Sequence, residues 1–190
     1  MKKILSPIIM MLFAALLLSV IPTEAEAAIY EDTVRLHILA PSDSAEDQAV
    51  KLAVRDTVLK KYSSELSDLG SSEEARARLL SLLPDIEETV NEYLLLQGYA
   101  YGAKVELKEE WYGTREYSGF TLPAGLYSSL VITLGKGEGQ NWWCVMYPPL
   151  CLDIATDGTE GYTESENRLI TAGGYRIKFK LLELISSLCR

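Results

Sequence analysis

The amino-acid sequence predicts an α+β fold, in which an N-terminal strand and two helices are followed by an antiparallel β-meander and a C-terminal helix. Two observations indicate this class. Apolar residues recur with a helical period through the first half of the chain, and after Gly98 the period falls to two, which is typical of half-buried strands. Helices grouped ahead of strands, instead of alternating with them, are the pattern of an α+β domain.

The N-terminus predicts a secretory signal peptide at residues 1–27. A pair of N-terminal lysines is followed by an unbroken apolar run at 8–18 and by a small-residue cleavage site, Ala-x-Ala, at 25–27. An uncleaved membrane anchor is the alternative, because the apolar segment approaches the ~20 residues that a spanning helix needs. In both cases we expect residues 28–190 to form a single extracytoplasmic domain.

The charge of the chain narrows the class of partner. The formal net charge is −9 at pH 7. An acidic exported domain is repelled by nucleic acid and by anionic lipid, so we expect neither as a partner. The sequence shows no small-molecule substrate, no internal repeat and no low-complexity tract.

The first strand and first helix are predicted from adjacent segments. Residues 33–40 (TVRLHILA) are rich in branched side chains, with apolar residues on one face. A helix then runs to about Leu66; Asp43 or Ser44 can cap it, and Ser44 with Asp47 makes a weak capping box. Apolar residues on two sides predict that this helix is sandwiched between layers.

A second helix is predicted from Ser71, where Glu74 completes a better capping box. Pro84 lacks an amide donor and clashes with the preceding turn, so it is expected to kink or split this helix. Gly98 ends it.

The second half of the chain predicts strands and one more helix. Alternating apolar residues mark strands at 103–107 and 126–134. The GKGEGQ run at 135–140 is expected to be a flexible hairpin loop that leads into a strand at 142–147. A clean apolar stripe at 177–188 predicts the C-terminal helix.

Few residues in this chain suggest catalysis. The single histidine, His37, lies inside the first strand and is expected to be structural. The three cysteines and His37 lack zinc spacing, and the GKGEG run lacks the GKS/T ending and the following helix of a phosphate loop. We therefore expect no catalytic residue, no cofactor, no metal and no enzymatic activity. A glycosidase-like pair of carboxylates, one acting as acid and the other as base, remains an open alternative. The candidate carboxylates include Glu87, Glu88, Glu109, Glu110 and Asp153.

Cys144 and Cys151 are candidates for a disulfide. In an oxidising compartment they can close a loop with Pro148 and Pro149 at its tip, because a proline pair between strand-like residues favours a turn. Two buried free thiols are the alternative. The pairing leaves Cys189 as an odd cysteine without an assigned role.

The two tryptophans before Cys144 are expected to divide between core and surface. Trp142 and Trp143 are adjacent in a strand, so they point to opposite faces of it. One is expected to pack in the core. The other is a candidate anchor for a partner, because tryptophan is enriched at interface hot spots.

A polar cluster is also predicted near the first helix. Arg35 lies in the strand, whereas Arg55 and Asp56 fall within the apolar sweep of the helix. Together with Asp43 or Asp47 they are expected to form a partly buried charge network that fixes the strand against the helix. A solvated set of charges is the alternative.

Three segments resemble the stage II sporulation protein R family. VRLHILAPSDSAEDQAVKLAVRDTV (34–58) and LPAGLYSSLVITLGKGEGQNWWCVMYPPLC (122–151) are similar to its two hallmark segments, and SSEEARARLLSLLPDIE (71–87) is similar too. The likeness covers roughly residues 33–153. One departure is Pro41, which stands where the family usually has an asparagine and so removes a possible helix cap.

The resemblance implies an intercellular signal. Members of this family are made in the forespore of endospore-forming bacteria and exported into the space between the forespore and mother-cell membranes. There they activate a membrane-embedded aspartic protease that processes the mother-cell sigma-E precursor. The candidate contacts with the extracytoplasmic face of this protease are Asn141, Trp142, Trp143, Pro148 and Pro149. The alternatives are a secreted carboxylate-dependent hydrolase of the cell envelope, which would lose function when one carboxylate becomes an amide, and a structural envelope protein.

Overall fold

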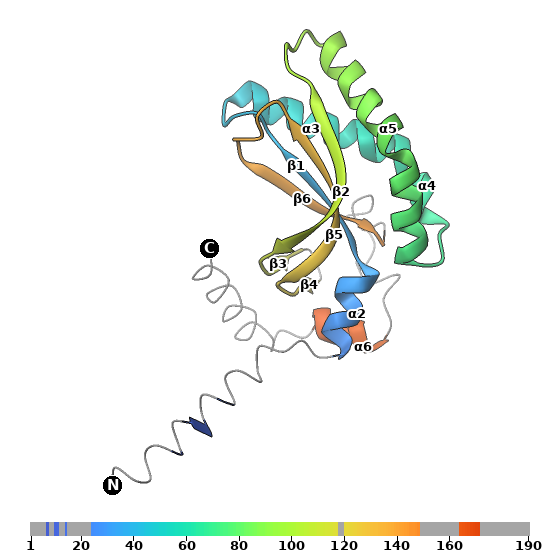
Figure 1. Ribbon diagram of the computed structural model, residues 1–190, viewed down its shortest axis with the longest axis vertical. Coiled ribbons are helices and arrows are strands. Elements are labelled where there is room, and N and C mark those ends of the chain that lie inside the picture. The colour runs from blue at the N-terminus through green and yellow to red at the C-terminus, as the bar shows by residue number, and fades with distance from the viewer. Residues whose placement is uncertain are drawn as a thin grey trace.

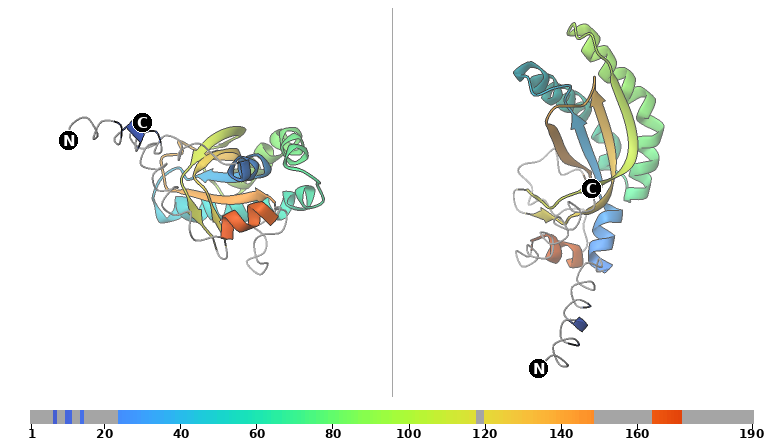
Figure 2. Two further views of the ribbon diagram at one scale, coloured as in Figure 1. Left: turned by 90° about the horizontal axis from the view of Figure 1, so that it is seen from below. Right: turned by 60° about the vertical axis from the view of Figure 1, so that its left-hand side comes forward.

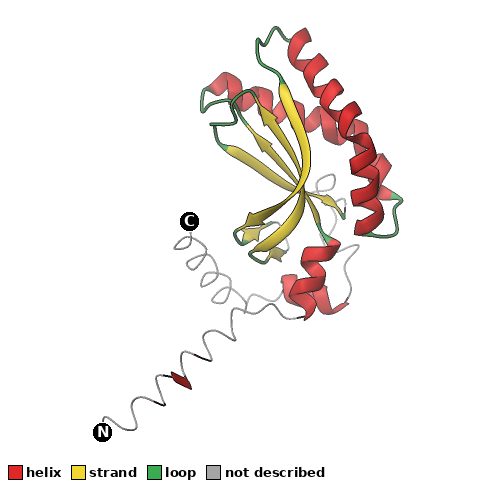
Figure 3. Cartoon of the chain, viewed as in Figure 1, coloured by secondary structure: helices red, strands yellow, loops and turns green. Residues whose placement is uncertain are grey.

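A mixed four-stranded β-sheet forms the centre of the protein. The computed structural model describes residues 24–117, 120–148 and 164–171, with the isolated residues 7, 10, 11 and 14. In chain order its elements are α2 (Glu24–Asp32), β1 (Val34–Leu39), α3 (Ala45–Tyr62), α4 (Ser64–Ser67), α5 (Ser72–Leu96), β2 (Ala103–Tyr112), β3 (Arg115–Glu116), β4 (Thr121–Leu122), β5 (Gly125–Leu134), β6 (Asn141–Tyr147) and α6 (Glu164–Thr171). Figure 1 and Figure 3 show the helices α3 and α5 beside this sheet.

The two faces of the sheet carry different cores. The larger core joins the sheet to α3, α4 and α5 and includes Leu36, Val54, Leu79, Val90 and Leu130. On the opposite face a smaller core joins the sheet to α2, α6 and the short β3–β4 pair (Figure 2, right). This smaller core includes Ile29, Tyr112, Leu122, Tyr127 and Ile170. The sheet is therefore covered by protein on both faces along part of its length.

The prediction of an α+β class is confirmed, but the prediction of an antiparallel meander is wrong. The strand order is β2-β5-β1-β6, and β1 pairs parallel with β5 and antiparallel with β6. The 135–140 run is thus not a hairpin loop, since β1 separates the strands that it connects. Burial explains this arrangement: five of the six residues of β1 are buried, which requires a paired neighbour on each side and cover on each face.

The first predicted helix is present as α3, and of the two predicted capping residues, Asp43 and Ser44, Ser44 is its N-cap. The Ser44 side chain accepts a hydrogen bond from the Asp47 amide. The prediction that this helix is sandwiched is wrong. Val54 and Val58 on one side are buried, whereas Leu52 on the other side is 39% exposed. The stripe that contains Leu52 enters the core only near the end of α3 and in α4, where Leu59 and Leu66 are buried.

The second predicted helix is present as α5. Ser71 caps it by accepting a hydrogen bond from the Glu74 amide, and the Glu74 carboxylate accepts one from the Gly70 amide. Pro84 does not split this helix, which continues to Leu96 as one element. The carbonyl that loses its donor belongs to Leu80, which is 55% exposed, so water can satisfy it.

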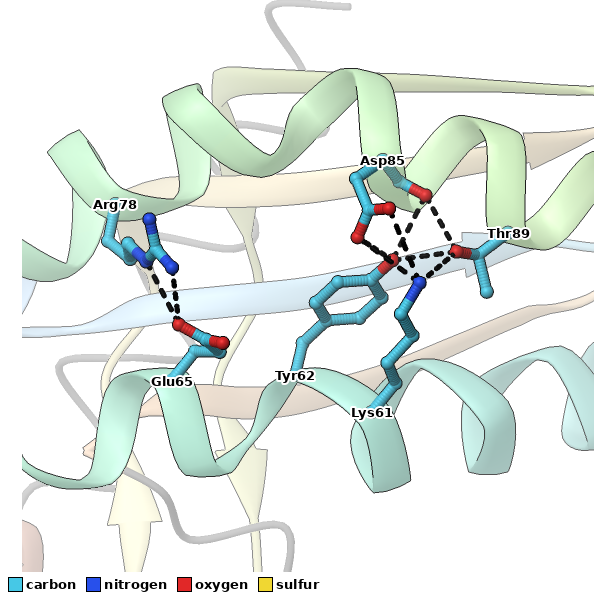
Figure 4. A network of polar contacts seen from close by, with 6 residues as sticks. All are labelled: Lys61, Tyr62, Glu65, Arg78, Asp85 and Thr89. Carbon is cyan, nitrogen blue, oxygen red and sulfur yellow. Dashed lines mark hydrogen bonds and ion pairs between the residues drawn. The ribbon is translucent and has the colours of Figure 1, made fainter.

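A polar network fastens α3 to α5 near Pro84 (Figure 4). The Tyr62 hydroxyl, on a side chain only 2% exposed, donates to the Asp85 carboxylate over 2.7 Å and lies 2.7 Å from the Thr89 hydroxyl. Lys61 donates to the Thr89 hydroxyl over 2.8 Å. These contacts join the end of α3 to α5 in the turns that follow Pro84.

The two ends of the chain bear on the predicted boundaries. Helix α2 begins at Glu24, and Glu26 and Ile29 are both fully buried. The predicted cleavage after residue 27 would therefore cut within α2. The predicted C-terminal helix at 177–188 lies outside the described residues.

Candidate functional site

The two hallmark segments meet at one end of the sheet. The loop after β1 and the loop before β6 bind each other, because the Gly139 amide donates to the Ala40 carbonyl over 2.9 Å and the Gln140 amide donates to Asp43 Oδ1 over 2.6 Å. A Cβ atom on Gly139 would lie 2.2 Å from the carbonyl oxygen of Ser42. This junction therefore requires glycine at position 139, and it explains why both loops have distinctive sequences.

Lys51 extends this junction into α3. The Lys51 ammonium donates to the Gln140 carbonyl over 2.9 Å and to Gln48 Oε1 over 2.6 Å. Burial lowers the pKa of Lys51, while the charge of Asp43 opposes that effect. The junction is a closed set of donors and acceptors that positions the start of β6.

Asp47 lies at the same junction and is held by two hydroxyls. The Ser42 hydroxyl donates to Oδ2 over 2.5 Å and the Tyr101 hydroxyl donates to Oδ1 over 2.8 Å. The hydrogen bond from Ser42 has the largest effect and lowers the pKa of Asp47; burial opposes it, and the hydrogen bond from Tyr101 lowers the pKa further. Asp47 thus remains ionised and ties the α3 start to the residues before β2.

Trp142 and Trp143 lie on opposite faces of β6. Trp142 packs against the larger core with the Arg55 guanidinium 5.1 Å from its ring, and Trp143 packs against the smaller core. The Trp143 ring stacks on His37 at 5.6 Å and has the Arg115 guanidinium 4.0 Å above it. Each tryptophan is half-buried. Both rings therefore combine packing with a solvent-accessible edge, in place of one core ring and one free ring.

A chain of polar side chains runs along the smaller-core face of the sheet. His37 Nδ1 lies 2.7 Å from Glu110 Oε2, the Tyr112 hydroxyl donates to the same oxygen over 3.2 Å, and the Tyr112 and Ser129 hydroxyls are 2.6 Å apart. Burial alone would raise the pKa of Glu110, but the hydrogen bond and charge of His37, with Lys108, lower it to about 2. His37 is 8% exposed, and its Nε2 atom has no partner in the described part of the chain. The chain combines an ionised carboxylate, an imidazole and two hydroxyls.

Arg35 lies next to this chain and is fully buried. Its Nη2 donates to the Tyr117 hydroxyl over 2.6 Å, and its guanidinium lies 4.1 Å from the Tyr112 ring centroid and 5.1 Å from that of Tyr127. Within the described ranges, its Nε and Nη1 have no hydrogen-bond partner. Aromatic faces and one hydroxyl thus surround a cation that no described carboxylate pairs.

Of the five residues predicted as a charge cluster, the structure brings together only Arg55 and Asp56. Their side chains form a 2.7 Å ion pair at the surface. Asp43 and Asp47 lie at the loop junction, and Arg35 lies on the opposite face of the sheet from α3. Strand β1 alternates its side chains between faces, so Arg35 points away from α3.

The other predicted contact residues are placed as follows. Asn141 is half-buried at the start of β6, and Pro148 is buried just after its end, so Pro148 is not presented to solvent. Cys144 is buried on the larger-core face at 9% exposure. Pro149, Cys151 and Cys189 lie outside the described residues, so the predicted pairing of Cys144 with Cys151 stays a prediction.

Several residues of these sites were not predicted from the sequence. Gln140, Lys51 and Tyr101 complete the loop junction, and Tyr112 and Ser129 complete the polar chain. A serine inside the apolar run LYSSLVITL was a signal that one face of β5 carries a buried polar group. The pairing of that group depends on strand order, which the sequence pattern alone did not supply.

The described residues show neither a metal-binding cluster nor a membrane-spanning helix. In the described ranges, no group of three or more His, Cys, Asp or Glu side chains is arranged to hold a metal ion. Among the same residues, no helix combines the length and the hydropathy that crossing a membrane requires.

Comparison with known proteins places the chain in a family. A relative named "Stage II sporulation protein R" from Bacillus subtilis (strain 168) is 39% identical over 140 residues, which cover 74% of this chain and 62% of the relative. The chain thus matches less than two thirds of that relative's length, and no solved structure matches it. Residues 30–157 match the family described as Stage II sporulation protein R (spore_II_R). This match spans more than half of the chain and includes both hallmark segments, so the chain belongs to the stage II sporulation protein R family.

Proposed function

We propose that this protein is an exported signalling protein of endospore formation. In this role it activates a membrane-embedded aspartic protease, which then processes the mother-cell sigma-E precursor. The observation that carries the proposal is the family match over residues 30–157, whose two hallmark segments pack into one unit around β1 and β6. The proposed place of action is the space between the forespore and mother-cell membranes.

Activation requires that the protein bind the active state of the protease more tightly than the inactive state. The start of β6, at residues 141–143, is the proposed contact surface. Strand β6 is an edge strand, its two tryptophans are each half-buried, and Arg55 and Arg115 lie over their rings. Aromatic side chains held by neighbouring contacts lose little conformational entropy on binding, which favours their use as anchors.

The proposed export rests on the N-terminal sequence. The apolar run and the small-residue site support a signal peptide. An oxidising compartment outside the cytoplasm would allow the proposed pairing of Cys144 with Cys151.

Reconstitution tests this function directly. Vesicles that contain the aspartic protease and its sigma-E precursor are mixed with the full chain, and precursor cleavage is followed with time. We expect cleavage only when this protein is added on the extracytoplasmic side. Cleavage that is equally fast without the protein contradicts the proposal.

Substitutions in β6 test the contact surface in the same system. Trp142→Ala and Trp143→Ala each remove half-buried packing and are expected to cost about 2–4 kcal/mol of stability. Trp142→Phe and Trp143→Phe keep an apolar ring in place, so they separate folding from docking. We expect at least one phenylalanine variant to fold with a wild-type melting temperature and to lose activation. Full activation by both contradicts a contact role for these rings.

Export has its own test in sporulating cells. A variant that lacks residues 1–23 keeps α2 whole, whereas one that lacks residues 1–27 loses its first turn and the buried Glu26. We expect both to remain in the cytoplasm and fail to signal, with the shorter deletion the more stable of the two. Full signalling from a cytoplasmic form contradicts extracytoplasmic action.

A carboxylate-dependent hydrolase is the alternative function. The pKa of Glu110 is lowered to about 2, while burial, the charge of Glu166 and a hydrogen bond with it raise the pKa of Asp32. An acid and a base catalyst must also flank one site, and no described contact joins these two carboxyl groups. Loss of both signalling and muropeptide release in folded Glu110→Gln and Asp32→Asn would favour the enzyme; retained signalling in both favours the docking protein.

A further inference from the structure

Strand β2 is an edge of the sheet, and the two halves of its free side differ. In the first half, side chains of α5 cover the backbone. Asn91 donates to the Ala103 carbonyl over 3.2 Å and accepts from the Ala103 amide over 2.8 Å, and Glu87 accepts from the Val105 amide over 2.9 Å. These contacts satisfy the groups that another strand would otherwise bind.

The second half of the same edge has no such cover. Backbone groups of an edge strand alternate between its partner and its free side, and the β2–β5 register runs without a shift. Since Ala103 and Val105 face outward, Leu107, Glu109 and Trp111 also present their amides and carbonyls outward. In the described part of the chain no side chain caps these groups.

A groove of about 510 Å³ opens beside this uncovered half. The residues that line it include Tyr30 from α2, Arg76 and Leu80 from α5, Leu107 from β2, and Leu126 from β5. Exposed apolar side chains gather at this end of the sheet: Leu80 is 55% exposed, Leu126 is 48% exposed, and Trp111, which pairs with Leu126, is 39% exposed. Helix α5 thus seals the start of the β2 edge and leaves an apolar groove along its end.

The charge on β2 itself defines what fits beside this edge. Two acidic side chains, Glu31 and Glu109, and two basic ones, Arg76 and Lys108, line the groove. Lys108 is paired with Glu110, whereas Glu31 and Glu109 form no ion pair with another described residue. Glu109 lies between Leu107 and Trp111 on the groove face of β2. A strand added to this edge would therefore place an apolar residue beside Leu107, a basic residue beside Glu109 and an apolar residue beside Trp111.

We propose that the free edge of β2 at residues 107–111 binds an extended segment of a partner protein by β-strand addition. Backbone hydrogen bonds to the three uncovered residues supply the attachment, and the groove selects the pattern apolar-x-basic-x-apolar. The pattern is symmetric, so it fits in either strand direction. This inference does not depend on the proposed function, because it names a binding edge and not its biological consequence.

Peptide titration tests the site with defined probes. The full chain in mild detergent is titrated with acetylated and amidated Val-Thr-Lys-Thr-Val, or with the same peptide carrying Glu in place of Lys. Amide resonances are followed by NMR. We expect saturable shifts at Leu107, Glu109 and Trp111 with the lysine peptide and at least tenfold weaker binding of the glutamate peptide. Glu109→Lys is expected to reverse this preference.

A proline variant tests the backbone contacts. The Glu109 amide faces the free side, so Glu109→Pro removes an outward donor without breaking the β2–β5 ladder. It should abolish binding of a peptide with neutral Thr at its centre, whereas Glu109→Thr keeps the amide and should retain that binding. If the proline variant does not fold, the charge reversal with Glu109→Lys decides the question.

Three results would overturn the inference. The first is the absence of shifts at these amides with the lysine peptide, and the second is equal binding of the lysine and glutamate peptides. The third is a concentration-dependent shift of the same amides without peptide, which would mean that a second copy of the chain occupies the edge. The titration contains no protease, so failure here leaves the proposed activation untouched. Failure of activation likewise leaves the edge site standing.

Discussion

Replacement of Glu110 by glutamine should make the stability of the protein less dependent on pH. The pKa of this carboxylate is about 2, against an ordinary value of 4.5. At ~1.4 kcal/mol for each pH unit, the difference corresponds to roughly 3 kcal/mol of native-state stabilisation. The side chain is 21% exposed, so solvent screening reduces the expected value to about 2 kcal/mol. This is a large share of the stability of a typical domain.

The sign of the pH effect follows from the direction of the shift. A lowered native pKa stabilises the fold fully above about pH 4.5, and this contribution is lost as the pH falls toward 2. Glu110→Gln should therefore be about 2 kcal/mol less stable than the wild type at pH 7, and the difference should close near pH 2. Urea unfolding followed by circular dichroism at pH 7, 4 and 2.5 measures it. Glu109→Gln, at the exposed neighbouring position, is the matched control. An equal loss at every pH, or none at pH 7, would refute the reasoning from the His37 contact.

Two further changes have defined outcomes. Gly139→Ala places a methyl group 2.2 Å from the Ser42 carbonyl oxygen and should lower the melting temperature by several degrees, whereas Gly70→Ala meets its nearest atom at 3.6 Å and should be close to neutral in the same calorimetric scan. Tyr62→Phe removes the hydroxyl that joins α3 to α5 and should cost about 1–2 kcal/mol in urea unfolding, while Tyr99→Phe, which removes no described hydrogen bond, should cost less than half of that. Equal effects within either pair would contradict these assignments.

Local features of the fold could be predicted from the sequence because they depend on neighbouring residues. The caps at Ser44 and Ser71 each involve a side chain and an amide three positions later, so the two partners are visible in one short segment. The same holds for the change of apolar period after Gly98. Helix and strand positions in the first half of the chain follow from such signals.

Strand order could not be predicted in this way. β1 ends at Leu39 and β5 begins at Gly125, so the two strands are distant in the sequence, and their parallel pairing depends on burial of β1 from both sides. The meander prediction assumed that successive strands pair, which is the usual case. Gly139 was a partial signal of this strand order. It allows the chain to approach Ser42 closely, and this approach lets β6 pair with β1 on the side away from β5.

Arg35 shows why the predicted charge cluster did not form as one network. An arginine between apolar residues in a strand suggested a side chain that leaves the core and meets the acidic residues of the next helix. The alternation of the strand instead directs it to the smaller core, where its guanidinium lies against the Tyr112 and Tyr127 rings and donates to Tyr117. These three tyrosines come from the second half of the chain, after the change in period.

Burial of such a cation is costly unless surrounding groups replace its hydration, so three aromatic side chains on that face have a structural reason to be present. The face of the sheet opposite the helices is thus a second core, built around Arg35 and the His37–Glu110 pair, and it is this core that carries the inner ring face of Trp143.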